Sequence, residues 1–334
     1  MIRVTQYMRR TEPSARSVER LFEDICAHLP ADIQVNSCRN RFFSCGISGR
    51  IYDIFRAWRH QGDVNHITGD VHFLTYFLDR RRTVLTIHDC VMLERLNGIR
   101  RWLVWLLWFW LPEKRCSVIT VISEATREQV LRHLNCEPGK VQLIYNNVSD
   151  EFKPVPQPFR AERPRLLQIG TNPNKNLERV ATALDGMNCI LVIIGRISSS
   201  QHQALTQHGV IWENFVDLSR EALALQYQIC DIVIFASTYE GFGLPIIEAN
   251  AVGRPVVTSN IWSMPEVAGD AACFVDPYDV SSLRDGICRV VGDSAYRDNL
   301  VAAGFENVKR FHAEAIAQQY ATIYRSLHGQ SRNI

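Results

Sequence analysis

Short runs of apolar residues alternate along the chain with segments whose apolar residues recur at helical spacing. The runs lack the period-two alternation of half-exposed strands, so each predicts a strand covered on both faces, as in a parallel sheet. This alternation continues through both halves and predicts an α/β fold with two doubly wound parallel sheets. The predicted strands span 2–8, 32–36, 64–68, 83–88, 118–122, 141–145, 166–170, 189–194, 210–212, 232–235 and 272–275, with another ending near residue 259.

The helical segments each show one apolar face, which we expect to pack on a sheet. Helices are predicted at 17–29, 47–59, 124–134, 280–291, 295–311 and 312–327, and from about residues 177 and 245. In 47–59 the residues expected to turn inward are Ile51, Ile54, Phe55 and Trp58. In 312–327 they are Ile316, Tyr320, Ile323, Tyr324 and Leu327.

A chain of 334 residues exceeds what one hydrophobic core usually supports, which predicts two domains. Four prolines between residues 152 and 164 indicate an extended connector. The predicted organisation is a Rossmann-like domain at 1–150, a linker at 151–164, a second Rossmann-like domain at 165–311 and a helical segment at 312–334.

The net charge of +2 is unevenly distributed. Residues 1–150 hold 21 Lys/Arg against 16 Asp/Glu, and the remainder holds 16 against 19. The basic half is compatible with an anionic membrane or acceptor, or with ordinary surface scatter. Ten dispersed cysteines without a CxxC pair, and arginines that interrupt any early apolar run, favour a reducing, cytoplasmic location.

The turn after the strand at 232–235 carries the candidate chemistry. Two glycines let the backbone bend sharply, and Pro245 suits the first helical position. Free amides and the positive dipole end of that helix form an anion site. Glu248 falls in the expected first turn, separated from Glu240 by seven residues, where it can bond a ribose hydroxyl. These features favour a nucleotide site, although a capped helix with an acidic first turn also occurs in many α/β proteins.

The sequence of this turn resembles the signature of glycosyltransferase family 4, whose members are retaining, nucleotide-sugar-dependent enzymes with the GT-B fold. The resemblance implies two Rossmann-like domains facing a cleft, and a last helix that crosses back to the first domain. The matching residues are Glu240, Gly241, Phe242, Gly243, Leu244, Pro245, Glu248, Ala249, Gly253, Pro255 and Val256.

The resemblance also implies how a donor is held. The amides of Gly243 and Leu244, with Lys175, would stabilise the departing diphosphate, and no metal or other cofactor is expected. Glu248 would bind the ribose and Glu240 the donor sugar, without a covalent nucleophile being assigned. Arg196, as a further phosphate candidate, Gly241 and Phe242 complete the expected donor site, while Lys175 has an alternative as a solvated loop residue.

In the first domain, the strand at 83–88 ends in His88 and Asp89, as in this family, and His88 is implied to contact the donor sugar. A loop-capping role is the alternative for His88. Ligands bind beyond the carboxyl ends of such strands, so an acceptor or sugar pocket is predicted after the strand at 64–68. Its candidate residues are His66, Gly69, Asp70 and His72, with Asp89.

Two segments of the first domain leave their roles open. The loop at 9–16 lacks the glycines common in the family, and its Arg9, Arg10 and Arg16 are interpreted as solvated surface rather than phosphate ligands. Trp102–Leu111 is too short to span a bilayer. Its four tryptophans beside basic residues favour contact with a membrane surface, with a buried helix as the alternative.

The function predicted from these features is transfer of a hexose from a nucleotide-diphosphate sugar to a saccharide or lipid-linked acceptor, with retention, in cell-envelope polysaccharide synthesis. No nucleic-acid partner is expected, and the enzyme would work in the cytoplasm or peripherally on the inner membrane face. Two alternatives remain: another GT-B enzyme such as a nucleotide-sugar epimerase, and a non-catalytic sugar-binding subunit.

Overall fold

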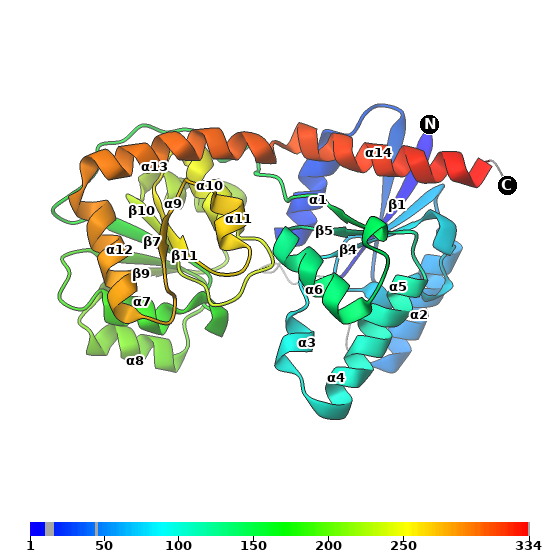
Figure 1. The fold of residues 1–334 in the computed structure, drawn as a ribbon, viewed down its shortest axis with the longest axis horizontal. Helices are drawn as coiled ribbons and strands as arrows, with labels where there is room; N and C mark the ends of the chain where they lie inside the picture. The colour runs from blue at the N-terminus through cyan, green and yellow to red at the C-terminus, as the bar shows by residue number, and fades with distance from the viewer. Residues whose placement is uncertain (11–16, 44–45, 333–334) are drawn as a thin grey trace. The chain divides into compact units, whose positions relative to one another are not determined.

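The computed structural model of the chain describes residues 1–10, 17–43 and 46–332. The chain divides into two compact units, Met1–Asn147 with Ala313–Ile334, and Val148–His312. Each unit is built on a six-stranded parallel sheet with helices on both faces (Figure 1). The prediction of two doubly wound parallel sheets is therefore confirmed. Across the described ranges, no helix is both long enough and apolar enough to cross a membrane.

The sheet of the first unit has the order β2-β1-β3-β4-β5-β6, with all neighbours parallel. Every residue of β3 and β4 is buried, so both faces of the sheet are covered. β2 ends three residues later than predicted because its pairing with β1 continues to Met8. The strands are β1 (Ile2–Met8), β2 (Ile33–Arg39), β3 (Val64–Ile67), β4 (Thr83–Ile87), β5 (Val118–Val121) and β6 (Val141–Leu143).

Helices and single turns connect these strands, and they follow the predicted segments with more interruptions. The apolar segment after residue 97 is divided among three successive helical pieces. The elements are α1 (Ser17–Ala27), α2 (Ile47–Arg59), η1 (His72–Phe77), η2 (Arg80–Arg82), α3 (Val91–Arg95), α4 (Gly98–Val104), η3 (Trp105–Trp110), α5 (Leu111–Lys114), α6 (Glu124–Leu134), η4 (Pro138–Lys140) and α14 (Ala313–Arg332).

The orientation of α2 differs from the prediction, although its bounds agree. Ile54 is buried as expected, but Ile51, Phe55 and Trp58 are exposed to solvent. The helix instead buries the face that carries Asp53, Ile54 and Ala57. The reason is a polar anchor, because the Asp53 carboxylate accepts hydrogen bonds from the backbone N–H groups of Arg41 and Phe42.

Helix α14 packs on α1 and on strands β1 and β3 of the first unit. Figure 1 shows it in red beside α1. All five residues of its predicted apolar face are buried. An exposed ion pair between Arg325 and Asp32, at 2.7 Å, adds a polar contact at the margin of the same unit.

The sheet of the second unit has the order β12-β11-β10-β7-β8-β9, again with all neighbours parallel. Its strands are β7 (Arg165–Ile169), β8 (Ile190–Ile194), β9 (Ile211–Phe215), β10 (Ile232–Phe235), β11 (Val256–Ser259) and β12 (Cys273–Val275). The helical elements are η5 (Pro173–Lys175), α7 (Leu177–Ala183), α8 (Ser199–Gln207), α9 (Arg220–Ile229), α10 (Leu244–Val252), α11 (Met264–Ala268), α12 (Val280–Gly292), α13 (Ser294–Asn307) and η6 (Val308–Phe311).

The strand order of the second sheet reverses between β7 and β10. The chain builds β7, β8 and β9 toward one edge and then returns to build β10, β11 and β12 toward the other. At such a reversal the loops that follow the two central strands diverge and leave a crevice, where ligands of open α/β sheets bind. In the first unit the corresponding reversal lies between β1 and β3.

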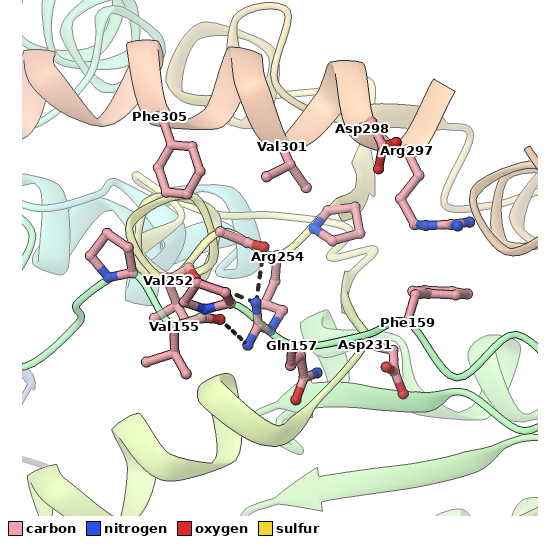
Figure 2. A pocket seen from close by; sticks show the side chains of 14 residues that line it. Val155, Gln157, Phe159, Asp231, Val252, Arg254, Arg297, Asp298, Val301 and Phe305 are labelled. Carbon is pink, nitrogen blue, oxygen red and sulfur yellow. Dashed lines mark hydrogen bonds between the residues drawn. The ribbon is translucent and has the colours of Figure 1, made fainter. Parts of the chain in front are cut away.

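The predicted linker has no helix or strand between residues 152 and 164 and is held on the second unit by Arg254. The buried Arg254 guanidinium donates to the carbonyls of Val155 at 2.9 Å and Gly253 at 3.1 Å (Figure 2). Beside it lies a cavity of about 310 Å³ near the amino ends of β10 and β11. None of the predicted site residues lines this cavity, which belongs to the sheet edge opposite the strand-order crevice.

We expect Arg254→Met to destabilise the protein by about 2–4 kcal/mol, because four main-chain carbonyls each lose a hydrogen bond from the guanidinium. The affected carbonyls are those of Val155, Gln228, Val252 and Gly253. Urea unfolding followed by circular dichroism measures the effect. Arg163→Met, at an exposed arginine of the same linker, is the matched control and should change the free energy of unfolding little. Equal effects of the two substitutions would contradict the anchoring role of Arg254.

Candidate functional site

Lys175 and Glu240 meet at the crevice of the second sheet. Lys175 ends η5 in the loop after β7, and Glu240 lies in the loop after β10. The Lys175 Nζ and Glu240 Oε1 atoms are 2.6 Å apart. The Asn174 Nδ2 atom donates to the same carboxylate oxygen at 3.1 Å and also to the Tyr239 carbonyl at 3.0 Å. The two predicted site residues are thus brought together by the reversal of strand order.

Backbone conformation explains why Lys175 lies over the end of its own strand. Gly170 has a φ of +85°, and a Cβ there would lie 3.0 Å from the Lys175 Cε atom. Any other residue would therefore displace the lysine. Asn176 has a left-handed φ of 63°, and its side-chain amide donates to the carbonyls of Ala236 and Pro277. These bonds attach the loop after β7 to the ends of β10 and β12.

The glycine turn before α10 bends sharply as predicted, but the helix begins one residue earlier than the sequence suggested. Gly243 has a φ of 115° and precedes the helix, which begins at Leu244 and has Pro245 at its second position. Glu248 consequently lies in the second helical turn and not in the first. The first N–H groups of a helix have no intrahelical acceptor, so this terminus retains the geometry of an anion site.

Glu248 is held by a tyrosine from the neighbouring helix α9. The Tyr227 hydroxyl donates a hydrogen bond to the Glu248 Oε2 atom. Burial raises the pKa of Glu248 to about 7, while the Tyr227 hydrogen bond and the nearby Lys175 charge oppose that rise. Lys175 is therefore electrostatically close to both signature acids.

Four residues that support this arrangement were not predicted as site residues: Asn174, Asn176, Tyr227 and Ser263. The Ser263 hydroxyl bonds the carbonyls of Phe242 at 2.7 Å and Glu240 at 3.1 Å, which fixes the turn between the two acids. Asn174 and Asn176 flank Lys175 in the polar loop after β7, and this position in the sequence could have identified them as site residues. For Tyr227 the sequence offered no such signal, because an aromatic residue one helical turn after Leu223 and Ala224 indicates core packing.

The remaining donor-site candidates contribute unequally. Phe242 is buried and packs against Phe311, with ring centroids 5.7 Å apart, so its side chain belongs to the core. Gly241, which follows Glu240 in the chain, and Leu244, the first residue of α10, are partly exposed. Arg196 is exposed after β8, and its carbonyl accepts a hydrogen bond from Thr171. A role for the Arg196 guanidinium stays a prediction.

His88 lies at the carboxyl end of β4 and has a defined tautomer. Its Nε2 atom is 2.7 Å from the Thr68 carbonyl, which can only accept a hydrogen bond. Nε2 therefore carries the proton, and in the neutral ring Nδ1 is an acceptor. The His88 carbonyl is 3.4 Å from the Thr126 hydroxyl. His88 thus joins the loops after β3 and β4 and presents a hydrogen-bond acceptor.

The predicted pocket residues Gly69, Asp70 and Asp89 form hydrogen bonds or ion pairs with other residues of the first unit. The Asp89 carboxylate accepts a hydrogen bond at 2.9 Å from the N–H of Val91, the first residue of the short helix α3. Asp70 is exposed and pairs with Arg9 at 3.3 Å. Gly69 is buried, and its carbonyl accepts from the Val71 N–H.

The structure corrects the predicted pocket roles of His66 and His72. His66 is fully buried, with Nδ1 at 2.7 Å from the Tyr324 hydroxyl and Nε2 at 2.8 Å from Thr86 Oγ1. Burial lowers the pKa of His66 to about 3, so the ring is neutral. His72 is also buried and bonds the Trp108 carbonyl at 2.7 Å. Both histidines serve the packing of the first unit.

Arg9 is not the solvated residue that the sequence suggested. Its guanidinium contacts the buried carboxylate of Glu19 at 3.2 Å as well as Asp70, so it joins α1 to the loop after β3. Arg10 donates to the Arg41 carbonyl at 2.8 Å and remains on the surface. Arg16 and the rest of the loop at 11–16 lie outside the described residues.

The tryptophan-rich segment Trp102–Leu111 is partly buried in the first unit, and its contact with a membrane surface stays a prediction. Phe109 is buried, and the indole N–H groups of Trp105 and Trp108 donate to backbone carbonyls of the same unit. Trp102, Leu103 and Leu107 are exposed to solvent. Only the first part of the segment therefore presents an apolar surface.

Two family models match consecutive parts of the chain. "Glycosyltransferase Family 4" matches residues 7–152, and "Glycosyl transferases group 1" matches residues 149–307. The chain belongs to glycosyltransferase family 4. The residues of the Lys175–Glu240–Glu248 cluster all fall within the second match, and His88 falls within the first.

Individual relatives are named as glycosyl-transferring enzymes. The chain is 39% identical to O-antigen chain mannosyltransferase B of Escherichia coli over 233 residues, which are 63% of this chain and 61% of the relative. It is 25% identical to O-antigen chain mannosyltransferase RfbU of Salmonella typhimurium over 255 residues, 71% of this chain and 70% of the relative. The match thus spans somewhat less than two thirds of the length of the E. coli relative.

Solved structures agree at the level of fold. The crystal structure of Anabaena Alr3699/HepE in complex with UDP and glucose superposes with a TM-score of 0.80 at 18% identity, covering 98% of this chain and 100% of that one. This likeness confirms the GT-B fold class predicted for this family 4 glycosyltransferase.

We predict that one glutamate side chain titrates near pH 7 and that Tyr227→Phe moves its pKa upward, because the lost hydroxyl stabilises the Glu248 carboxylate. Carbon-13 NMR of protein labelled at glutamate Cδ measures this titration. Glu248→Gln must remove the resonance, which assigns it. The environment described for Glu248 is refuted if every glutamate titrates below pH 5.5 in the folded protein.

Proposed function

We propose that the protein is a retaining glycosyltransferase that moves a hexose from a nucleotide-diphosphate sugar to a saccharide or lipid-linked acceptor. The observation that supports this most strongly is the placement of Lys175, Glu240 and Glu248 around the strand-order crevice of the second sheet. One cation beside two acids and a helix N-terminus provides complementary groups for a diphosphate and for sugar hydroxyls.

The diphosphate would bind at the start of α10. The amides of Gly243 and Leu244 lie at the N-terminal end of that helix, where the dipole favours negative charge. Lys175 adds a full positive charge that borders the same aromatic ring as this terminus: its Nζ atom lies 4.6 Å from the Phe235 ring centroid, and a Cβ at Gly243 would lie 3.3 Å from that ring. Groups that are already in position where charge develops lower the barrier of bond cleavage, so these donors would stabilise the departing diphosphate. We assign no metal or other cofactor to this step.

Glu248 would accept hydrogen bonds from the ribose hydroxyls. Its partner Tyr227 occupies Oε2, which leaves Oε1 for the ligand. A ligand that donates to the carboxylate favours its charged form and would lower the raised pKa of Glu248. Nucleotide binding should therefore be coupled to proton release around pH 7.

Glu240 would bind the donor sugar. Its Oε1 atom is already bonded to Lys175 and Asn174, so the carboxylate is held in one orientation before a sugar arrives. We do not propose that Glu240 forms a covalent intermediate. His88 would accept a hydrogen bond from a sugar hydroxyl at Nδ1, which its tautomer leaves unprotonated.

The names of the relatives support a more specific donor and acceptor. Both bacterial relatives described above are called O-antigen chain mannosyltransferases, and the Anabaena structure was solved with UDP and glucose. We therefore propose mannose as the first hexose to test and a growing cell-envelope polysaccharide as the acceptor. The enzyme would act on the cytoplasmic side of the membrane, where nucleotide sugars are available.

The direct test is to incubate the protein with UDP-, GDP- and ADP-linked hexoses, mannose included, and a panel of lipid-linked oligosaccharides. We expect one donor to yield a new α-glycoside with the anomeric configuration of the donor, as read by proton NMR. Free epimerised nucleotide sugar without a glycoside would favour an epimerase. Binding of the donor without any product would favour a non-catalytic subunit.

We expect Lys175→Met to lower kcat/KM at least about 100-fold, because a partly buried positive charge next to the leaving group is lost. Glu240→Gln should lower kcat/KM as well, while nucleotide-diphosphate affinity changes less than about threefold. Lys309→Met is the matched control, since this exposed lysine pairs with Glu306 near the helical turn that precedes α14. Wild-type kcat/KM in Lys175→Met would exclude the proposed donor site.

A further inference from the structure

Helix α2 exposes an apolar stripe that has no covering element within the described part of the first unit. Ile47, Ile51, Phe55 and Trp58 follow one another at spacings of four, four and three residues, which places them on one side of a helix. Their exposed fractions are 75%, 48%, 48% and 49%. The opposite side, with Ile54 and Ala57, is buried. The helix is therefore amphipathic, but this apolar side faces water.

Further aromatic residues extend this stripe. Phe77, at the end of η1 and 51% exposed, packs against Phe55 with ring centroids 5.5 Å apart. Tyr52 packs against the exposed Phe42 at 5.5 Å. We call Ile47, Ile51, Phe55, Trp58 and Phe77 the α2 face. Clustered exposed apolar residues are uncommon on soluble proteins and mark interaction surfaces.

Positive charges outnumber negative charges around the α2 face. Residues 36–62 contain five arginines and a single acid, Asp53. The Asp53 carboxylate is buried and bonded to backbone N–H groups, so it contributes little negative charge at the surface. Arg59 is exposed at the end of α2, and Arg80 and Arg81 are exposed shortly after Phe77. The one exposed acid between them, Asp79, is paired with Arg82 at 3.3 Å. The partner of the α2 face should therefore offer both an apolar region and negative charge.

We propose that α2 is an interfacial helix that lies flat in the headgroup region of an anionic lipid bilayer. Its apolar stripe would enter the acyl boundary, and the flanking arginines would reach the lipid phosphates. Tryptophan and arginine are suited to this boundary. A 13-residue helix is too short to span a bilayer, which fits surface binding. This docking element lies outside the tryptophan-rich segment and needs none of the donor-site residues.

Vesicle flotation with the full chain tests the proposal. Protein is mixed with vesicles of phosphatidylcholine alone or with about 30% phosphatidylglycerol, and no donor is present. The wild type should float with the anionic vesicles, and Phe55→Ser combined with Trp58→Ser should lower the partition coefficient at least about tenfold. The matched control is Ile211→Ser with Leu225→Ser, which removes two apolar residues of similar exposure, 51% and 49%, from the second unit. It should bind as the wild type does.

Further measurements distinguish lipid binding from misfolding and from self-association. Substitution of Arg59 and Arg81 by Gln should weaken binding to anionic vesicles and reduce its salt dependence. Unchanged melting temperatures show that the exposed substitutions leave the fold intact. Equal flotation of wild type and the Phe55/Trp58 variant would overturn the proposal, as would a dimer that becomes monomeric in that variant while flotation persists. The Phe55/Trp58 variant should still transfer sugar to a water-soluble acceptor. A loss of vesicle binding can therefore be distinguished from a loss of the proposed transferase activity.

Discussion

The reversal of strand order between β7 and β10 is the constraint on which the candidate site depends. It separates the loops that follow these neighbouring strands and gives each a free side. The loop after β7 carries Lys175, the loop after β10 carries Glu240, and their 2.6 Å ion pair joins the two. Glycine at position 170 and left-handed Asn176 are needed because the first loop must fold back over its own strand. Sheet topology, backbone conformation and local charge therefore determine one site together.

The placement of Lys175, Glu240 and Glu248 near one another could be predicted from the sequence because most of the features that determine it are local. The apolar run of β10, the glycine turn and the two acids lie within seventeen positions, from Ile232 to Glu248, and a parallel strand needs no distant information to be recognised. Lys175 was found because it stands in a polar loop directly after a buried strand. The predicted start of α10 was wrong by one residue, since the N–H that proline lacks has no intrahelical acceptor at either of the first two helical positions.

Features that depend on distant partners were missed. His66 was predicted to line a pocket because it lies near the end of a strand, yet its partners are Thr86 and Tyr324, the latter 258 residues away on α14. Tyr227 likewise finds Glu248 only through the packing of α9 beside α10. In α2, periodicity revealed two unlike faces but not which of them meets the sheet. The buried carboxylate of Asp53 decided that, and no pattern in the sequence identifies which backbone amides it will bind.

Hydrogen–deuterium exchange with and without a saturating nucleotide sugar can locate the donor without any substitution. If the donor binds at the strand-order crevice of the second sheet, exchange will slow in peptides covering residues 170–176 and 239–248. Peptides covering 154–159 and 252–255, beside the Arg254 cavity at the opposite sheet edge, should be unchanged. Protection confined to those latter peptides, or absent from both crevice loops, would show that the donor binds elsewhere and refute the proposed site.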